Sequence, residues 1–173
     1  MTRIGFHNKC HYILALLIAF TLPFVKFTPI FIGLIFVNWL AEGGLLVKLK
    51  RVFSNKCSLL FVLFYTAHII GLLYTENLDS GFFDLEVKLS LLIFPLVISG
   101  KPFSKKEVSH VFVALIVGLV YASFYMLSRS LSLYLINGEN AFFYGNLASY
   151  IHTSYVSMYM NVAIVGLFLS LLK

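Results

Sequence analysis

Long apolar runs alternate with short polar segments along the whole chain. A helix needs about 20 predominantly apolar residues to cross a hydrocarbon core of roughly 30 Å. Apolar runs of about this length or somewhat shorter recur along the chain, and each predicts a transmembrane helix. In chain order, the six predicted helices cover 12–20, Pro29–Leu46, Ser58–Tyr74, 82–100, Glu107–Leu135 and His152–Leu172.

The first two runs are short, and a polar, proline-containing segment separates them. Pro23 and Pro29 each remove a backbone donor and clash with the preceding turn, so they predict a break between two short, tilted helices. One long kinked helix is the alternative. Arg3 and Lys9 precede the first run as in a signal peptide, but no small-x-small cleavage site follows it. The first run is therefore predicted to be an uncleaved spanning helix.

Composition supports a membrane protein. The chain has 173 residues, of which 60% are hydrophobic and 12% charged, and its mean hydropathy is +0.93. A soluble domain needs more polar surface than this composition provides. The sequence thus predicts an all-α, polytopic helix bundle, with residues 1–173 forming a single transmembrane domain and no linker inside it.

The basic residues predict the orientation of the helices. Ten of them fall in alternating loops on one side of the predicted bundle, whereas Lys26, Lys88 and Arg129 fall on the other. Short loops rich in Lys and Arg stay in the cytoplasm, so both termini are predicted to lie inside. The net charge of +6 follows this loop pattern, which argues against nucleic acid as a partner.

One basic cluster has a pattern of its own. Lys48, Lys50, Arg51 and Lys56 are interleaved with the apolar residues of 45–53, which predicts a short amphipathic helix on the membrane surface. The single tryptophan, Trp39, is predicted to anchor its helix at the bilayer interface. Cys10 and Cys57 lie 47 residues apart with no C-x-x-C spacing, so free thiols are expected.

Three charges stand at the start of the fourth predicted helix. Asp84, Glu86 and Lys88 precede a run that is apolar through Ile98, and charges there cost free energy unless they meet water, a partner or a ligand. Asp84 and Lys88 are four residues apart and can form an ordinary ion pair along the helix. Alternatively, Lys88 offers its ammonium group to a lipid phosphate while Glu86 orients that group or a sugar hydroxyl. Snorkelling of Lys88 to the interface is a third interpretation.

Arg129 ends a polar stripe on the fifth predicted helix. Tyr121, Tyr125 and Arg129 recur every four residues, with Ser128 and Ser132 beside them, so the stripe is predicted to face the bundle interior or a water-filled cleft. The planar guanidinium suits a diphosphate, because it donates two charge-assisted hydrogen bonds. The alternative is an arginine at the helix end that contacts lipid headgroups.

A histidine and two tyrosines share one face of the sixth predicted helix. His152, Tyr155 and Tyr159 follow the spacing i, i+3, i+7, and His152 can bind an anion or donate to a sugar oxygen. The alternative is an aromatic belt that anchors this helix at the headgroups. His68 lies in the middle of the third predicted helix and is predicted to be a packed, hydrogen-bonded histidine. No H-E-x-x-H, G-x-S-x-G, P-loop or D-x-x-D motif occurs, so no metal or cofactor is expected.

Three blocks of the sequence, 68–77, 83–96 and 152–159, carry a family resemblance. They read HIIGLLYTEN, FDLEVKLSLLIFPL and HTSYVSMY, and in order and spacing they resemble the N-terminal half of bacterial O-antigen ligases and O-antigen polymerases. The resemblance implies a multi-pass inner-membrane glycosyltransferase. Such enzymes transfer a glycan from a polyprenyl-diphosphate carrier to lipid A-core or a growing polymer on the periplasmic face, without a metal.

The resemblance also implies which residues face the carrier. Family members are about twice as long and hold their catalytic basic residues in and around a large periplasmic loop, whereas the longest outward connection here is 137–150. The chain is therefore expected to be an N-terminal fragment, inactive alone, that contributes polar groups to the diphosphate cleft. These candidates are Lys88, Glu86, Arg129, His152 and Tyr155. The alternative is a small non-catalytic transporter or scaffold subunit, in which the outer charges pair with one another or snorkel.

Overall fold

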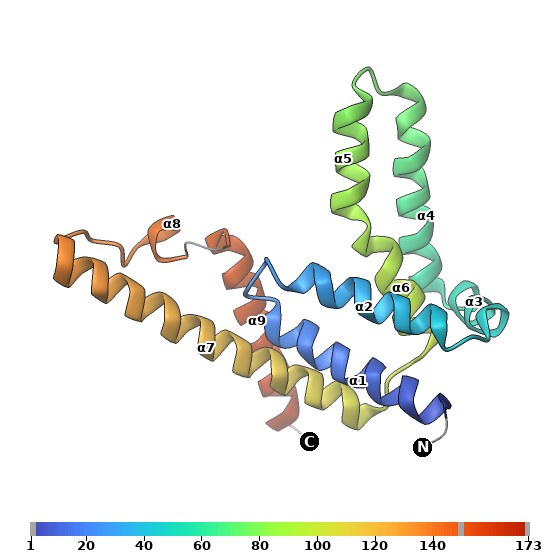
Figure 1. Ribbon diagram of the computed structural model, residues 1–173, viewed down its shortest axis with the longest axis horizontal. Helices are drawn as coiled ribbons and strands as arrows, with labels where there is room; N and C mark the ends of the chain where they lie inside the picture. Colours follow the sequence, from blue (N-terminus) through green and yellow to red (C-terminus); the bar gives the residue numbers. More distant parts are fainter. Residues whose placement is uncertain (1–2, 149–150, 172–173) are drawn as a thin grey trace. The chain divides into compact units, whose positions relative to one another are not determined.

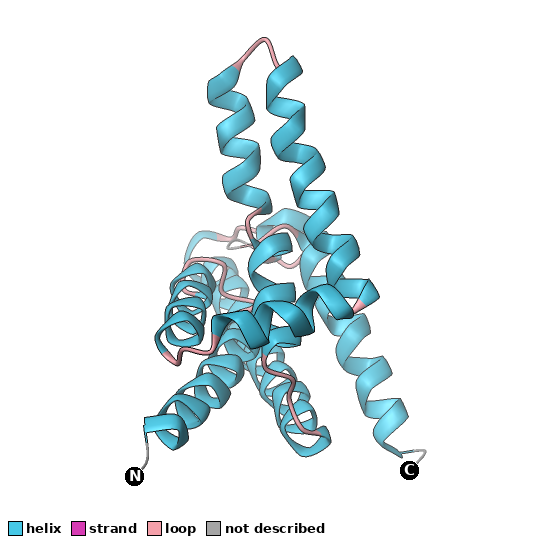
Figure 2. Cartoon of the chain, turned by 90° about the vertical axis from the view of Figure 1, so that its right-hand side faces the viewer, coloured by secondary structure: helices cyan, strands magenta, loops and turns pink. Residues whose placement is uncertain are grey.

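The computed structural model describes residues 3–148 and 151–171, and every regular element among them is a helix (Figure 2). In chain order (Figure 1) the helices are α1 (Arg3–Thr21), α2 (Thr28–Ala41), α3 (Leu45–Ser54), α4 (Lys56–Gly71), the 3₁₀ turn η1 (Leu72–Tyr74), α5 (Leu78–Lys88), α6 (Ser90–Gly100), α7 (Lys105–Asn137), α8 (Tyr144–Leu147) and α9 (Thr153–Leu171). The all-helical prediction is confirmed for this part of the chain.

The chain divides into two compact units. The first comprises Met1–His11 and Ile32–Ser104, and the second comprises Tyr12–Phe31 and Lys105–Lys173. Helices α1 and α2 contribute residues to both units. Residues 22–27 form a turn between these helices, in which the Thr28 hydroxyl donates to the Thr21 carbonyl at 2.8 Å. The two-helix interpretation of this region is thus confirmed, and a single kinked helix is not observed.

In the first unit, α6 packs against α3 and α4. Val52 of α3 and Val97 of α6 are fully buried there, and the hydroxyls of Ser58 and Ser99 are hydrogen-bonded across α4 and α6. Helices α4 and α5 form a hairpin, the two upright helices in Figures 1 and 2. The Tyr65 hydroxyl donates to the Leu85 carbonyl at 3.3 Å and joins the two arms of this hairpin.

The predicted helix over 82–100 is wrong in one respect, because it is broken at Leu89. Helix α5 begins four residues earlier than predicted, at Leu78, where the Asn77 side chain accepts a hydrogen bond from the Ser80 amide. At the break, the Leu89 amide donates to Glu86 and the Leu92 amide to Leu89. These bonds span three residues rather than four, so the chain tightens locally and α6 starts as a separate helix.

In the second unit, α7 packs against α9 and against the C-terminal part of α1. One buried cluster comprises Ala19, Leu115, Leu119 and Ala163, and another comprises Ala122, Met126, Ala148 and Val156. Gly118 allows a close approach, because a Cβ atom at this position would lie 2.2 Å from the Phe20 carbonyl oxygen. Small residues at helix contacts are typical of membrane proteins, in which backbones pack closely.

Two segments are long and apolar enough to cross a membrane: Lys56–Tyr74 (19 residues) and Lys105–Asn137 (33 residues). Helices α2 and α3 qualify only together and are bent by 117°, which makes at most three spans by length and composition within the described residues. These segments indicate a helical membrane protein. The predicted total of six spans and the inward termini stay predictions.

Candidate functional site

The three charged residues predicted at the outer rim all lie on α5. The Lys88 ammonium nitrogen is 2.7 Å from Asp84 Oδ2, which confirms the predicted i,i+4 ion pair. The Glu86 side chain is exposed, and its position two residues from both partners places it on another face of the helix.

A hollow of about 310 Å³ lies between the arms of the α4–α5 hairpin. Asp84 and Thr75 contribute to its lining, together with the half-buried His68. His68 Nδ1 lies 2.9 Å from the Phe64 carbonyl oxygen, which confirms the prediction of a hydrogen-bonded histidine inside the helix. The carboxylate in its lining is already paired, so the hollow offers little unused charge to a ligand.

Arg129 occupies a polar site in the second unit. Its guanidinium donates to the Asn146 carbonyl oxygen at 3.1 Å, and the neighbouring Ser130 hydroxyl, fully buried, donates to the Ala141 carbonyl at 2.9 Å. These two bonds hold the segment after α7 against the end of that helix. They frame a hollow of about 570 Å³, lined by Arg129, Leu133, Glu139, Asn140, Ala141, Gly145 and Asn146.

The chemistry of this Arg129 hollow suits a ligand that carries both anionic and hydroxyl groups. A guanidinium has five N–H donors, and Asn146 is the only acceptor that Arg129 contacts within the described residues. The remaining donors can bind phosphate oxygens in a fork. Glu139 and Asn140 in the same lining can accept or exchange hydrogen bonds with sugar hydroxyls.

The polar stripe of α7 does not face a packed interior, which was one of its two predicted settings, and a water-filled cleft stays a prediction. Tyr121, Tyr125 and Ser128 are exposed, whereas the buried face of the helix carries Gly118, Ala122, Met126 and Ser130, among others. Helices α1 and α9 pack against small and apolar side chains of α7, and the exposed Tyr121 contacts the rings of Phe20 and Phe24. Arg129 is half-buried because it lies at the edge of that buried face, next to Ser130.

The candidate residues on α9 and directly before it lie partly at the surface and partly in the core. His152 precedes the helix, is exposed, and its Nδ1 accepts a hydrogen bond from the Ser154 amide at 3.3 Å. Tyr155 is exposed, whereas Tyr159 packs against the buried cluster around Ala163. Lys88 and Glu86 belong to the first unit, and Arg129, His152 and Tyr155 belong to the second. That all five line one cleft stays a prediction.

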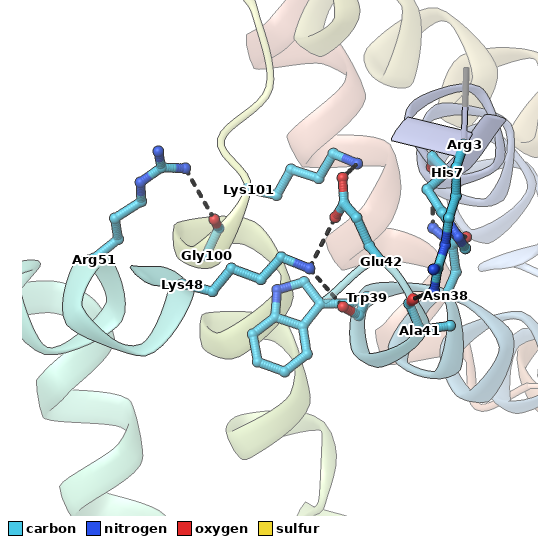
Figure 3. Close-up of polar contacts among 10 residues, drawn as sticks. All are labelled: Arg3, His7, Asn38, Trp39, Ala41, Glu42, Lys48, Arg51, Gly100 and Lys101. Carbon is cyan, nitrogen blue, oxygen red and sulfur yellow. Dashed lines mark hydrogen bonds and ion pairs between the residues drawn. The ribbon is translucent and has the colours of Figure 1, made fainter. Parts of the chain in front are cut away.

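Sequence reasoning missed a buried charge cluster in the first unit, which Figure 3 shows. The two carboxylate oxygens of Glu42 each bind one ammonium group, Lys101 at 2.7 Å and Lys48 at 2.8 Å. Lys48 also donates to the Trp39 carbonyl and lies 5.1 Å above the indole ring. Trp39 is only 2% exposed, so its predicted role as an interface anchor is wrong. The cluster is defined as Trp39, Glu42, Lys48 and Lys101.

The turn between α2 and α3 creates this cluster. Gly43 and Gly44 have φ angles of +84° and +67°, a conformation that side chains strongly disfavour, and they reverse the chain so that Lys48 reaches back to Glu42. The ammonium groups of Lys101 and Lys48 compensate the charge of the Glu42 carboxylate where the fold removes it from water. A lone acidic residue before a Gly-Gly pair was the available sequence signal.

Other polar contacts hold the same region together. Arg3 donates to the Ala41 carbonyl at 3.1 Å, and His7 Nδ1 lies 2.8 Å from the Asn38 amide oxygen, so the start of α1 is bound to the end of α2 (Figure 3). Arg51 donates to the Gly100 carbonyl. Because each charge in the cluster already has a partner, we regard it as structural rather than ligand-binding.

No protein-family model, curated protein sequence or solved structure matches this chain, and the family resemblance of its three sequence blocks stays a prediction.

Proposed function

We propose that the chain forms the N-terminal membrane part of an O-antigen ligase-type glycosyltransferase of the bacterial inner membrane. In this proposal, six helices span the bilayer with both termini in the cytoplasm. The enzyme takes a glycan from a polyprenyl-diphosphate carrier and transfers it to lipid A-core or a growing polysaccharide on the periplasmic face. The observation that carries the proposal is the polar hollow around Arg129, which joins an arginine to groups suited to sugar hydroxyls.

The roles of the candidate residues follow from their chemistry. Arg129 neutralises the carrier's diphosphate, a task that a metal ion performs in many phosphate-binding sites. Lys88 and His152 add positive charge or hydrogen-bond donors at the same rim, and Glu86 and Tyr155 contact sugar hydroxyls. Support comes from the family resemblance of the blocks that contain Lys88, Glu86, His152 and Tyr155.

Binding of the carrier provides the direct test. The purified chain in detergent micelles is titrated with a polyprenyl diphosphate, and Arg129→Gln is compared with the native protein. Loss of charge-assisted hydrogen bonds worth about 1.5–3 kcal/mol predicts roughly tenfold to hundredfold weaker binding. Arg3→Gln is the matched control, because Arg3 also donates to a backbone carbonyl but lies on the predicted cytoplasmic side. Equal affinity of the native protein and Arg129→Gln would refute the role of Arg129.

Two further measurements address the rest of the proposal. In the full-length enzyme, Lys88→Ala and Arg129→Ala should each reduce glycan ligation, and native activity in both would remove these residues from the site. The orientation is tested with a membrane-impermeant thiol reagent. The exposed thiol of Cys57 should react only when the reagent reaches the cytoplasmic face, and labelling from the periplasm would reverse the orientation.

A non-catalytic transporter or scaffold subunit is the second candidate. The ion pair between Lys88 and Asp84 favours it, because a lysine that is already paired within its helix needs no anionic ligand. This candidate predicts no change in carrier binding for Arg129→Gln, whereas the glycosyltransferase predicts a loss.

A further inference from the structure

Helix α3 keeps only part of its apolar side inside the protein. Val52 is fully buried against the first unit, and Lys48 is drawn inward by Glu42. Leu46 and Phe53 project outward and are 85% and 54% exposed. The ion pair therefore fixes a rotation of α3 that presents two large apolar side chains to the surroundings. In water this exposure is unfavourable, so the outward side requires an apolar medium.

Basic residues flank these two apolar side chains. Lys50 follows Leu46 by one helical turn and Lys56 follows Phe53 by three residues, and both are exposed. Residues 45–56 contain no acidic side chain, and the nearest one, Glu42, is already bound to Lys48 and Lys101. The positive charge of Lys50 and Lys56 is thus available to an external anion.

The place of α3 in the chain puts it at a bilayer boundary. It ends at Ser54, and the membrane-length segment Lys56–Tyr74 begins two residues later. Figure 1 shows α3 almost end-on and α4 from the side, so α3 lies crosswise to the helix that follows it. This orientation is typical of a helix that runs along the membrane plane at the level of the headgroups.

We propose that α3, together with Lys56 at the start of α4, binds acidic phospholipids of the membrane leaflet next to it. Leu46 and Phe53 insert among the acyl chains, and the ammonium groups of Lys50 and Lys56 bind the headgroup phosphates. Each basic residue near an acidic membrane surface contributes about 1 kcal/mol, so the two together predict a roughly 25-fold preference for acidic over zwitterionic lipid. This inference does not depend on the proposed glycosyltransferase function.

The first experiment measures the lipid preference. The full chain in a zwitterionic detergent is titrated with phosphatidylglycerol and with phosphatidylcholine, and bound lipid is counted by native mass spectrometry. Lys50→Gln with Lys56→Gln should lose most of the preference for phosphatidylglycerol. Lys105→Gln with Lys106→Gln removes the same charge from another predicted cytoplasmic segment and should retain it. Equal preference in the Lys50/Lys56 variant and the native protein, or an equal loss in the control, overturns the proposal.

The second experiment measures insertion. The native protein has one tryptophan, Trp39, which is buried and gives a low baseline of quenching by brominated phospholipids in nanodiscs. Phe53→Trp and Leu46→Trp should each add tryptophan emission that brominated phospholipids quench strongly. Two separate variants are used so that poor folding of one still leaves the other as a test. Tryptophans at 53 and 46 that are quenched no more than Trp39 would contradict insertion of α3.

Discussion

The buried Glu42 cluster gives the sharpest prediction for stability. Glu42→Gln keeps the size of the side chain but removes the negative charge that Lys48 and Lys101 share. The side chain of Lys48 is only 9% exposed, so its ammonium group would stay in the interior without a counter-charge. The variant thus isolates the electrostatic contribution of one carboxylate.

The magnitude follows from the geometry. Two unit charges about 2.8 Å apart attract by roughly 6 kcal/mol at an effective dielectric constant of about 20, and desolvation cancels much of this attraction. Removing one partner of a buried pair typically costs about 3–5 kcal/mol. We expect about 3 kcal/mol, because Lys48 retains the Trp39 carbonyl and ring, and the Lys101 side chain, 20% exposed, can reach water.

A second substitution separates charge burial from a simple loss of contacts. Lys48→Met, added to Glu42→Gln, removes the uncompensated charge and keeps an apolar stem over the Trp39 ring. Replacing both members of a buried pair is often close to neutral. The double variant should therefore be more stable than Glu42→Gln alone, and a further loss of stability would show that the contacts of Lys48 matter more than its charge.

Trp39 provides the assay, since it is the only tryptophan and lies within the cluster. Its emission is followed during denaturant unfolding in micelles, which gives the free energy of unfolding. Asp84→Asn is the control, because it breaks an exposed i,i+4 pair that water screens and that therefore contributes little to stability. If Glu42→Gln lowers the free energy of unfolding no more than Asp84→Asn does, the buried ion pairs of Glu42 do not stabilise the fold.

Two further predictions concern close packing and the Arg129 hollow. Gly118→Ala should lower the free energy of unfolding by about 2 kcal/mol or more, because the new methyl would meet the Phe20 carbonyl. Gly33→Ala is the control: nothing lies within 4 Å of its new methyl, so it should stabilise α2 by up to about 1 kcal/mol. Equal melting temperatures of the two variants would contradict the close approach of α1 and α7. Ser130→Ala removes the fully buried hydroxyl that donates to the Ala141 carbonyl, so it should lower the free energy of unfolding by about 1–3 kcal/mol. Amide hydrogen exchange in residues 139–147 should become faster. Unchanged exchange there would mean that this hydrogen bond does not hold the segment.

Local rules accounted for the helices and for one ion pair. The apolar runs around 58–74, 107–135 and 152–172 became α4 with η1, α7 and α9 with small shifts at their ends. A backbone hydrogen bond within a helix joins residues four apart, so the residues of one run are sufficient to predict that the run is helical. The pair between Asp84 and Lys88 has the same spacing and was predictable for the same reason.

Contacts between distant residues could not be predicted in this way. Lys101 meets Glu42 across 59 residues only because the Gly43–Gly44 turn, the break at Leu89 and the packing of α6 on α3 bring them together. The same packing buries Trp39, which by composition alone resembled an interface anchor. For the candidate site, the sequence indicated Arg129 but not its acceptor Asn146 or the Glu139 lining, which depend on how the chain folds back after α7.

The sequence by itself determined that this protein is helical and apolar enough for a membrane, because helix formation and transfer into hydrocarbon depend on each segment separately. Only the tertiary structure decided which charges are buried together and which face of α7 is covered. Those outcomes depend on turn geometry and on the packing of helices that are far apart in the chain, and a linear pattern does not encode either one directly.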